Sequence, residues 1–135
     1  MANILVIDDE AVVRHLVGDI LADDGHEVRT ATTADAALSE LDDRTLELVV
    51  SDIAMPGLSG LELLAAARRQ RPSVPVVLVT GQATHGTVSE ALAAGADGLV
   101  MKPFSHAELL RTVGTALRRS ARRTTETSDV LLEVS

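Results

Sequence analysis

Acidic, hydroxyl and amine side chains follow four apolar runs of the sequence, each at the point where the run ends. Asp8 and Asp9 follow one run, Asp52 and Thr80 end two others, and Lys102 follows the last. Carboxylates gathered within a few ångströms repel one another unless a proton or a hard cation neutralises them. A set of oxygen ligands, in a chain without cysteine and without histidine at ligand spacing, favours Mg²⁺ over zinc. In such a group an aspartate can attack phosphorus, while a lysine and a hydroxyl stabilise phosphoryl oxygens.

Each of these residues also has a simpler interpretation. An aspartate at the end of a strand often caps the following helix, and Lys102 could form an ordinary ion pair with the acids. These interpretations suit one residue at a time. They do not explain why four strand ends carry such groups at once, so we favour a common site.

The apolar runs predict buried strands that bring these residues to one edge of a sheet. The runs cover residues 4–7, 48–52, 76–79 and 98–101 and lack polar alternation, which is typical of central strands in a parallel sheet. Residues 27–30 are short and alternating, which predicts an exposed edge strand. Ligand sites of open α/β sheets lie at the carboxyl ends of the strands.

Helical periodicity separates the predicted strands. Apolar residues recur at helical spacing within residues 13–21, 34–41, 61–65, 88–92 and 110–117, and Ser-x-x-Glu or Thr-x-x-Glu capping boxes begin at Ser59, Thr87 and Ser105. Residues 68–71 carry three arginines, which we expect in solvent. Five strands alternating with five helices predict a doubly wound α/β fold with a five-stranded parallel sheet, flavodoxin-like, in the strand order 2-1-3-4-5.

Composition limits the classes of function. With 135 residues, of which 46% are hydrophobic, the chain can build one domain with a core. The net charge of −8 argues against direct nucleic-acid binding, and the lack of a long apolar segment argues against a membrane location, leaving a cytoplasmic protein as the expectation. We expect the domain to occupy residues 1–119, and the polar residues 120–135 to form a disordered tail or a linker stub.

The motifs together resemble the receiver domain of two-component response regulators, over residues 2–119. The matching positions are the acid pair Asp8-Asp9, the phosphoacceptor Asp52, the turn Met55-Pro56-Gly57, the hydroxyl residue Thr80, and Lys102-Pro103-Phe104 preceded by Gly95-Ala96-Asp97.

The resemblance implies that Asp52 accepts a phosphoryl group from a sensor histidine kinase or a histidine phosphotransfer protein, which shifts the domain between inactive and active conformations. Mg²⁺ would bridge Asp9, Asp52 and the Ala54 carbonyl, and Asp8 would hold metal-bound water. Such a domain is not an enzyme in the usual sense, because it catalyses only its own phosphorylation and dephosphorylation. A downstream effector protein or an output domain would read its state. The resemblance also implies a cis peptide bond at Lys102-Pro103.

Two departures from the family's pattern concern switching and phosphoryl lifetime. Leu99 stands where the family usually has Tyr or Phe, three residues before the lysine. The usual coupling of that ring to the hydroxyl of Thr80 therefore does not carry over intact. Ala54 and Gln82 would flank the approach of hydrolytic water and tune the lifetime of the phosphoryl group.

Two other functions stay open at this point. A vestigial receiver would bind proteins independently of phosphorylation and would fail to accept phosphate. A Mg²⁺-dependent phosphohydrolase would turn over phosphate esters, but the usual Asp-x-Asp-x-Thr signature of one such class is absent, since Ile53 and Ala54 follow Asp52. We expect the four histidines, His15, His26, His85 and His106, to lie on the surface.

Overall fold

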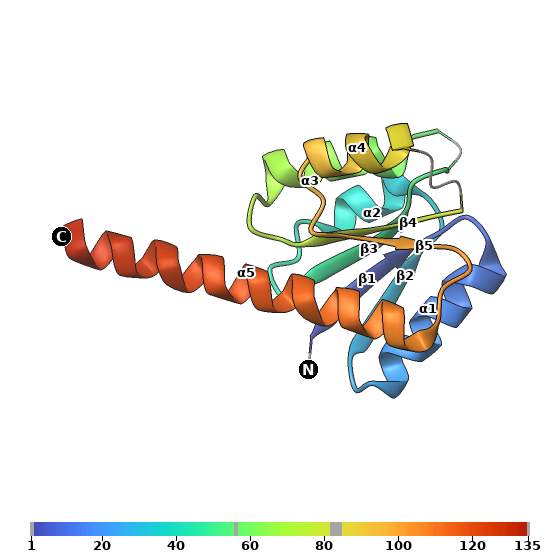
Figure 1. Ribbon diagram of the computed structural model, residues 1–135, viewed down its shortest axis with the longest axis horizontal. Helices are drawn as coiled ribbons and strands as arrows, with labels where there is room; N and C mark the ends of the chain where they lie inside the picture. Colours follow the sequence, from blue (N-terminus) through green and yellow to red (C-terminus); the bar gives the residue numbers. More distant parts are fainter. Residues whose placement is uncertain (1, 56, 82–84, 135) are drawn as a thin grey trace.

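The computed structural model describes residues 2–55, 57–81 and 85–134, and its backbone alternates strands and helices (Figure 1). The elements are β1 (Asn3–Ile7), α1 (Ala11–Asp23), β2 (Glu27–Ala31), α2 (Ala34–Glu40), β3 (Leu48–Asp52), α3 (Gly60–Gln70), β4 (Val76–Thr80), α4 (His85–Ala93), β5 (Gly98–Met101) and α5 (His106–Val134).

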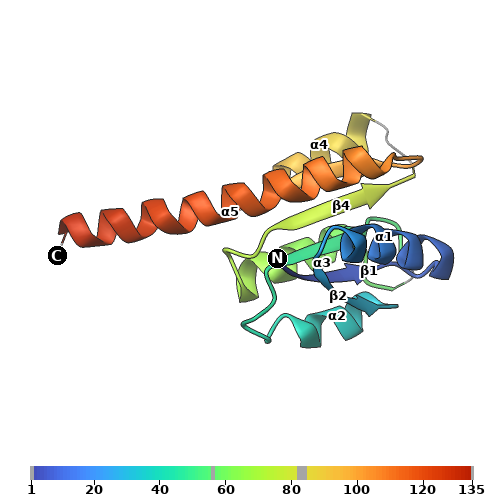
Figure 2. The same ribbon diagram turned by 90° about the horizontal axis from the view of Figure 1, so that it is seen from below.

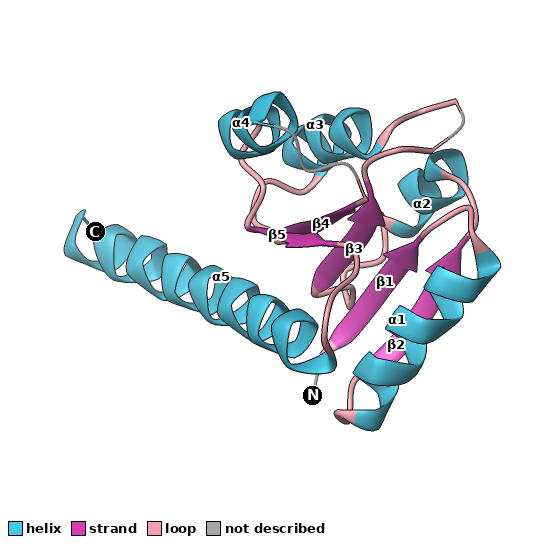
Figure 3. Cartoon of the chain, turned by 45° about the vertical axis from the view of Figure 1, so that its right-hand side comes forward, coloured by secondary structure: helices cyan, strands magenta, loops and turns pink. Residues whose placement is uncertain are grey.

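The five strands form one parallel sheet in the order β2-β1-β3-β4-β5, as predicted (Figure 3). β3 lies in the middle of this order, and all five of its residues are buried. β2 lies at one edge and its first residue, Glu27, is exposed, which explains the polar alternation of that segment. Because every strand runs in the same direction, the residues that follow them meet at one edge of the sheet.

Two layers of helices cover the sheet, which lies between them in Figure 1 and is seen from the side of α1 and α5 in Figure 2. Leu5 and Ile7 of β1 pack in the layer that holds α2, α3 and α4, while Ile4 and Val6 pack in the layer that holds α1 and α5. Successive residues of a strand point to opposite faces of the sheet, so an uninterrupted aliphatic strand supplies both cores.

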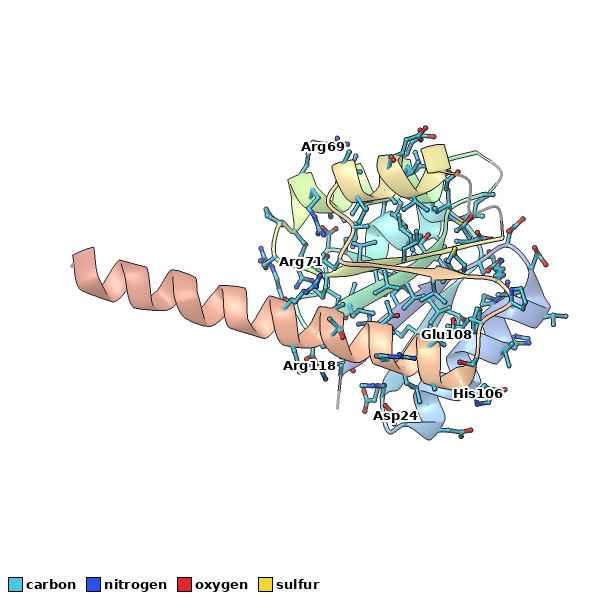
Figure 4. The ribbon with its side chains drawn as sticks, in the orientation of Figure 1. Asp24, Arg69, Arg71, His106, Glu108 and Arg118 are labelled. Atoms are coloured by element: carbon cyan, nitrogen blue, oxygen red, sulfur yellow. The ribbon has the colours of Figure 1, made fainter. Side chains whose placement is uncertain are left out.

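Two arginines at the end of α3 correct one prediction, because Arg68 in the helix and Arg71 just after it bind backbone carbonyls instead of lying free in solvent. Arg71, labelled in Figure 4, donates to the carbonyl oxygens of Asp43 at 2.8 Å and Leu46 at 3.0 Å. Arg68 donates to the carbonyl of Val74 and pairs with Asp97 at 2.5 Å. These bonds tie the end of α3 to the loops that precede β3, β4 and β5.

The helix starts confirm one predicted capping box in full. Ser59 and Glu62 exchange both bonds of the box at the start of α3. Ser105 Oγ accepts from the backbone N–H of Glu108 at the start of α5. α4 begins at His85, two residues before Thr87, so the predicted N-cap at Thr87 is wrong.

α5 continues to Val134 and projects beyond the sheet (Figures 1 and 3), which differs from the predicted disordered tail. That residues 120–135 form a linker stub stays a prediction. The sequence has no Pro after Pro103 and no Gly after Gly114, so no residue type in this stretch breaks a helix. Within the described part of the chain, no helix combines the length and apolar character needed to cross a membrane.

Candidate functional site

The carboxyl edge of the sheet holds the predicted site residues. Asp52 and Thr80 are the last residues of β3 and β4, and Asp8 follows β1 directly. Asp8, Asp52 and Thr80 are 3%, 5% and 4% exposed, so two carboxylates lie nearly out of contact with bulk water. Ionised carboxylates at such burial require a nearby positive charge.

Lys102 supplies that charge. Its Nζ lies 3.3 Å from Oδ2 of Asp52 and 3.7 Å from Oδ2 of Asp8, and its backbone N–H donates to the Thr80 carbonyl at 2.8 Å. Burial alone would lower the pKa of Lys102, but the carboxylates of Asp52 and Asp8 outweigh it and raise that pKa above its usual value. The ammonium group therefore stays protonated at neutral pH.

The turn after β1 holds Asp8 through backbone and side-chain contacts. The N–H of Glu10 donates to Oδ1 of Asp8 at 2.9 Å, and Nη1 of Arg14 donates to the Asp8 carbonyl at 2.9 Å. Burial raises the pKa of Asp8 and the charge of Asp52 adds to this effect, while the bond from Glu10 opposes it. Asp8 is thus a carboxylate whose negative charge a bound cation would relieve.

Three carboxylates form a compact group that could hold a metal ion. One oxygen each from Asp8, Glu10 and Asp52 lie within 4.8 Å of one another. Glu10 was not among the predicted ligands, although its place in the acidic run after β1 could have indicated it. Asp9 was predicted as a ligand, but it is exposed and outside this group. An all-oxygen donor set with excess negative charge fits Mg²⁺.

An open pocket of about 340 Å³ gives access to the group. Its lining comes from four strand ends and the start of α4: Glu10, Asp52, Ile53, Ala54, Thr80, Gly81, Thr87 and Lys102. The backbone N–H of Ala54 donates to Oδ1 of Asp52 at 3.3 Å, so the carboxylate is oriented from the loop side as well as by Lys102. The pocket therefore joins the predicted nucleophile, hydroxyl and cation in one space.

Two predictions depend on residues that lie outside the described part of the chain. These are the turn at 55–57, which includes Pro56, and the role of Gln82. Gly57 has a φ of 77°, which suits a glycine in a tight turn. The peptide bond between Lys102 and Pro103 is cis, as predicted.

A parallel sheet of this order with an acidic pocket at its carboxyl edge defines a receiver-type signalling domain. Residues 4–114 match the family model of the response regulator receiver domain, and the chain belongs to this family.

Known proteins of this family are similar over most of the chain. The two-component response regulator PhoP of Pseudomonas aeruginosa is 38% identical over 119 residues, which cover 88% of this chain and 53% of PhoP. The nitrogen assimilation regulatory protein NtrX of Azorhizobium caulinodans is 42% identical over 85% of this chain and 26% of NtrX. The chain thus spans about half the length of one relative and a quarter of the other.

Solved structures agree with the fold. The crystal structure of NtrX from Brucella abortus in complex with ATP has a TM-score of 0.87 and 42% identity, covering 96% of this chain and 29% of that chain. The chemotaxis protein CheY4 of Vibrio cholerae has a TM-score of 0.80 and 33% identity, covering 87% of this chain and 99% of that chain.

Proposed function

We propose that the chain is a phosphoacceptor domain in which the Asp52 carboxylate receives a phosphoryl group from a phosphohistidine. The observation that carries this proposal is the position of Asp52, 5% exposed, on an open pocket and 3.3 Å from the ammonium group of Lys102. A carboxylate oxygen is the nucleophile of such a transfer, and the ammonium group of Lys102 lies close enough to balance charge at the reacting atoms.

The transfer is a displacement at phosphorus. An oxygen of Asp52 forms the new P–O bond while the P–N bond of the phosphohistidine breaks, and the electron pair of that bond returns to the imidazole ring. The ammonium group of Lys102 balances negative charge on the transferring oxygens, and the hydroxyl of Thr80 donates to one of them after transfer. Both residues line the same pocket as Asp52.

Mg²⁺ would be held by Asp8, Asp52 and the Ala54 carbonyl, with Asp9 as the resemblance implies and Glu10 as the geometry suggests. Its charge would neutralise the carboxylates and stabilise the phosphoryl oxygens. Burial, together with the nearby charge of Asp52, raises the pKa of Asp8, and a bound cation would offset both effects.

The partners follow from the chemistry and from the relatives. A sensor histidine kinase or a histidine phosphotransfer protein would present the phosphohistidine, and the chain would meet it in the cytoplasm. Because PhoP and NtrX are much longer than the matched region, we propose that an output domain or an effector protein reads the phosphorylated state. The net charge of −8 favours a protein over nucleic acid as the direct partner of this chain.

Intact-mass spectrometry with acetyl phosphate tests the proposal. The parent should gain one phosphoryl group in the presence of Mg²⁺ and none after chelation, and Asp52→Asn should abolish the gain. Failure of the parent to gain mass under any condition would favour a vestigial receiver. Steady turnover of phosphate esters by the parent, lost in Asp52→Asn, would favour a phosphohydrolase.

A further inference from the structure

Gly60, the first residue of α3, packs directly against the backbone that carries Asp52. A Cβ atom at this position would lie 2.8 Å from Cα of Ile53 and 3.0 Å from the carbonyl carbon of Asp52, and would overlap the Asp52 carbonyl oxygen. These atoms belong to the backbone, so they cannot move aside as the end of a flexible side chain could. Gly60 does not have a positive φ, so the requirement for glycine here is one of space.

Hydrogen bonds join the same atoms into one unit. The N–H of Gly60 donates to the Ile53 carbonyl at 2.9 Å, and the N–H of Ile53 donates to the Val79 carbonyl at 3.0 Å. The Asp52 carbonyl, which leaves no room for a Cβ on Gly60, accepts from Oγ of the buried Ser51 at 3.0 Å. The start of α3 is therefore bonded to the segment that carries the nucleophile.

α3 is less free to move than Ala54, which follows the Asp52 strand. Leu63 and Leu64 of α3 are buried in the core at 1% and 0% exposure, and the capping box fixes the first turn. Ala54, in contrast, is exposed. The backbone of Asp52 is buried as well, so a side chain at position 60 would press α3 against two parts of the core. The shift would be relieved towards the exposed Ala54, because moving α3 or β3 disrupts a close-packed core.

We propose that Gly60 is a positioning residue for the phosphoacceptor site. By bringing α3 against the Asp52 backbone, it sets where the Asp52 carboxylate and the Ala54 carbonyl stand relative to Asp8 and Lys102. This inference rests on the proposed function, because it assigns to Gly60 the alignment of the metal-binding and phosphoryl-accepting atoms. Neither its N–H nor its Cα touches the reacting groups.

Gly60→Ala tests the inference against two matched glycine variants. In Gly98→Ala the new Cβ would lie 2.6 Å from Cγ2 of Thr112, which is a clash with a side chain at the amino-terminal end of β5, away from the site. In Gly18→Ala the new Cβ would lie 3.6 Å from Cγ1 of Val28, which is ordinary contact. Each variant is measured for unfolding midpoint, Mg²⁺ dissociation constant by calorimetry, and rate of phosphorylation by acetyl phosphate.

The inference expects Gly60→Ala to weaken Mg²⁺ binding by about tenfold or more, as loss of groups that orient metal ligands commonly does, and to slow phosphorylation. Gly98→Ala should lose stability while its Mg²⁺ affinity stays within about twofold of the parent. Gly18→Ala should keep the affinity of the parent and should not lose stability, because alanine is favoured over glycine inside a helix. A Gly60→Ala protein that is destabilised like Gly98→Ala but binds Mg²⁺ like the parent would overturn the inference.

Ser51→Ala keeps the test decisive if Gly60→Ala does not fold. It removes the hydroxyl that donates to the same Asp52 carbonyl, and it adds no clash. The inference requires the metal site to depend on the position of the Asp52 carbonyl, which both Gly60 and Ser51 contact. Mg²⁺ binding should therefore weaken measurably in Ser51→Ala, and unchanged binding would overturn the inference. A parent that neither binds Mg²⁺ nor gains phosphate would instead refute the proposed function, which is a separate outcome.

Discussion

Nζ of Lys102 lies 3.3 Å from Oδ2 of Asp52, and Lys102 is the only lysine in the chain. The pair joins the residue after β5 to the last residue of β3, with β4 between them. A cation from one strand end thus stabilises the nucleophile of another across the central part of the sheet edge.

Replacing this cation should destabilise the domain in a way that Mg²⁺ repairs. We expect Lys102→Met to lower the free energy of unfolding by about 1–3 kcal/mol without Mg²⁺, because buried carboxylates lose their partner. Saturating Mg²⁺ should recover a larger share of stability in the variant than in the parent, since it supplies the missing positive charge. Urea denaturation with and without Mg²⁺ measures both effects. An equal gain from Mg²⁺ in both proteins would contradict the shared role of the two cations.

The third carboxylate at the metal site can be identified by comparing Asp9 with Glu10. We expect Asp9→Asn to weaken Mg²⁺ binding more than Glu10→Gln, because the acid pair Asp8-Asp9 matches the metal-binding acids of the receiver family. Calorimetric titration of the two variants gives the comparison, and each replacement removes one charge with little change in size. A larger loss of Mg²⁺ affinity in Glu10→Gln would instead identify Glu10 as the ligand, together with Asp8 and Asp52.

Leu99 should weaken the transmission of phosphorylation to the distal face. This half-buried leucine packs against the core cluster of the α2–α4 layer, where the family usually has an aromatic ring. The smaller side chain buries less apolar surface when the domain switches. At about 25 cal/mol per Å², this reduces the free-energy preference for the active conformation by roughly 1 kcal/mol, which is about fivefold in the ratio of active to inactive conformations.

Hydrogen exchange with and without phosphodonor measures that transmission. Protection should change strongly near Ala54 and Gly81 but modestly over residues 88–100, and Leu99→Tyr should enlarge the distal change. A large distal response in the parent that Leu99→Tyr leaves unaltered would assign the signal to another element.

Asp43 should make the fold sensitive to acid. Bonds from the side chain and backbone of Thr45, together with one from Arg29, lower the pKa of this carboxyl from 3.8 to about 2. Because the pKa in the folded state lies below the unfolded value, the contribution to stability is present above pH 3.8 and is lost as the pH falls towards 2.

Measuring the free energy of unfolding between neutral pH and pH 2 tests whether Asp43 stabilises the fold only above its lowered pKa. Asp43→Asn should be less stable than the parent at neutral pH, and the difference should shrink below pH 3.8. Asp19→Asn, an exposed position on α1, serves as the control and should show no such convergence. A difference between Asp43→Asn and the parent that stays constant down to pH 2 would contradict the assignment.

The strands and the location of the site could be predicted from the sequence, because each buried strand is an apolar run that ends on a polar site residue. Aliphatic runs ending on Asp52 and Thr80 indicated buried strands and a shared edge, because parallel strands leave no other place for their carboxyl ends. The polar character of residues 27–30 similarly identified the edge strand. The cis bond before Pro103 required the family resemblance, since an X-Pro bond is usually trans.

The part that could not be predicted depends on long-range contacts. Arg68 and Arg71 follow an exposed helical pattern, yet their partners are carbonyls and a carboxylate 6 to 30 residues away in the sequence. Which acid of residues 8–10 faces Asp52 depends on the path of the turn, which periodicity does not encode. The polar composition of residues 120–135 favours disorder, whereas the lack of Pro and Gly after Gly114 permits the helix that α5 forms.

Chemical mapping of the phosphoryl group tests the central claim most directly. Borohydride reduces an acyl phosphate but leaves free carboxylates intact, so treatment after incubation with acetyl phosphate and Mg²⁺ converts a phosphorylated aspartate into homoserine. Peptide mass spectrometry should locate homoserine at position 52 alone and find none when Mg²⁺ is chelated. Homoserine at position 8 or 9, or phosphate retained without any homoserine, would contradict the assignment of Asp52 as the phosphoacceptor.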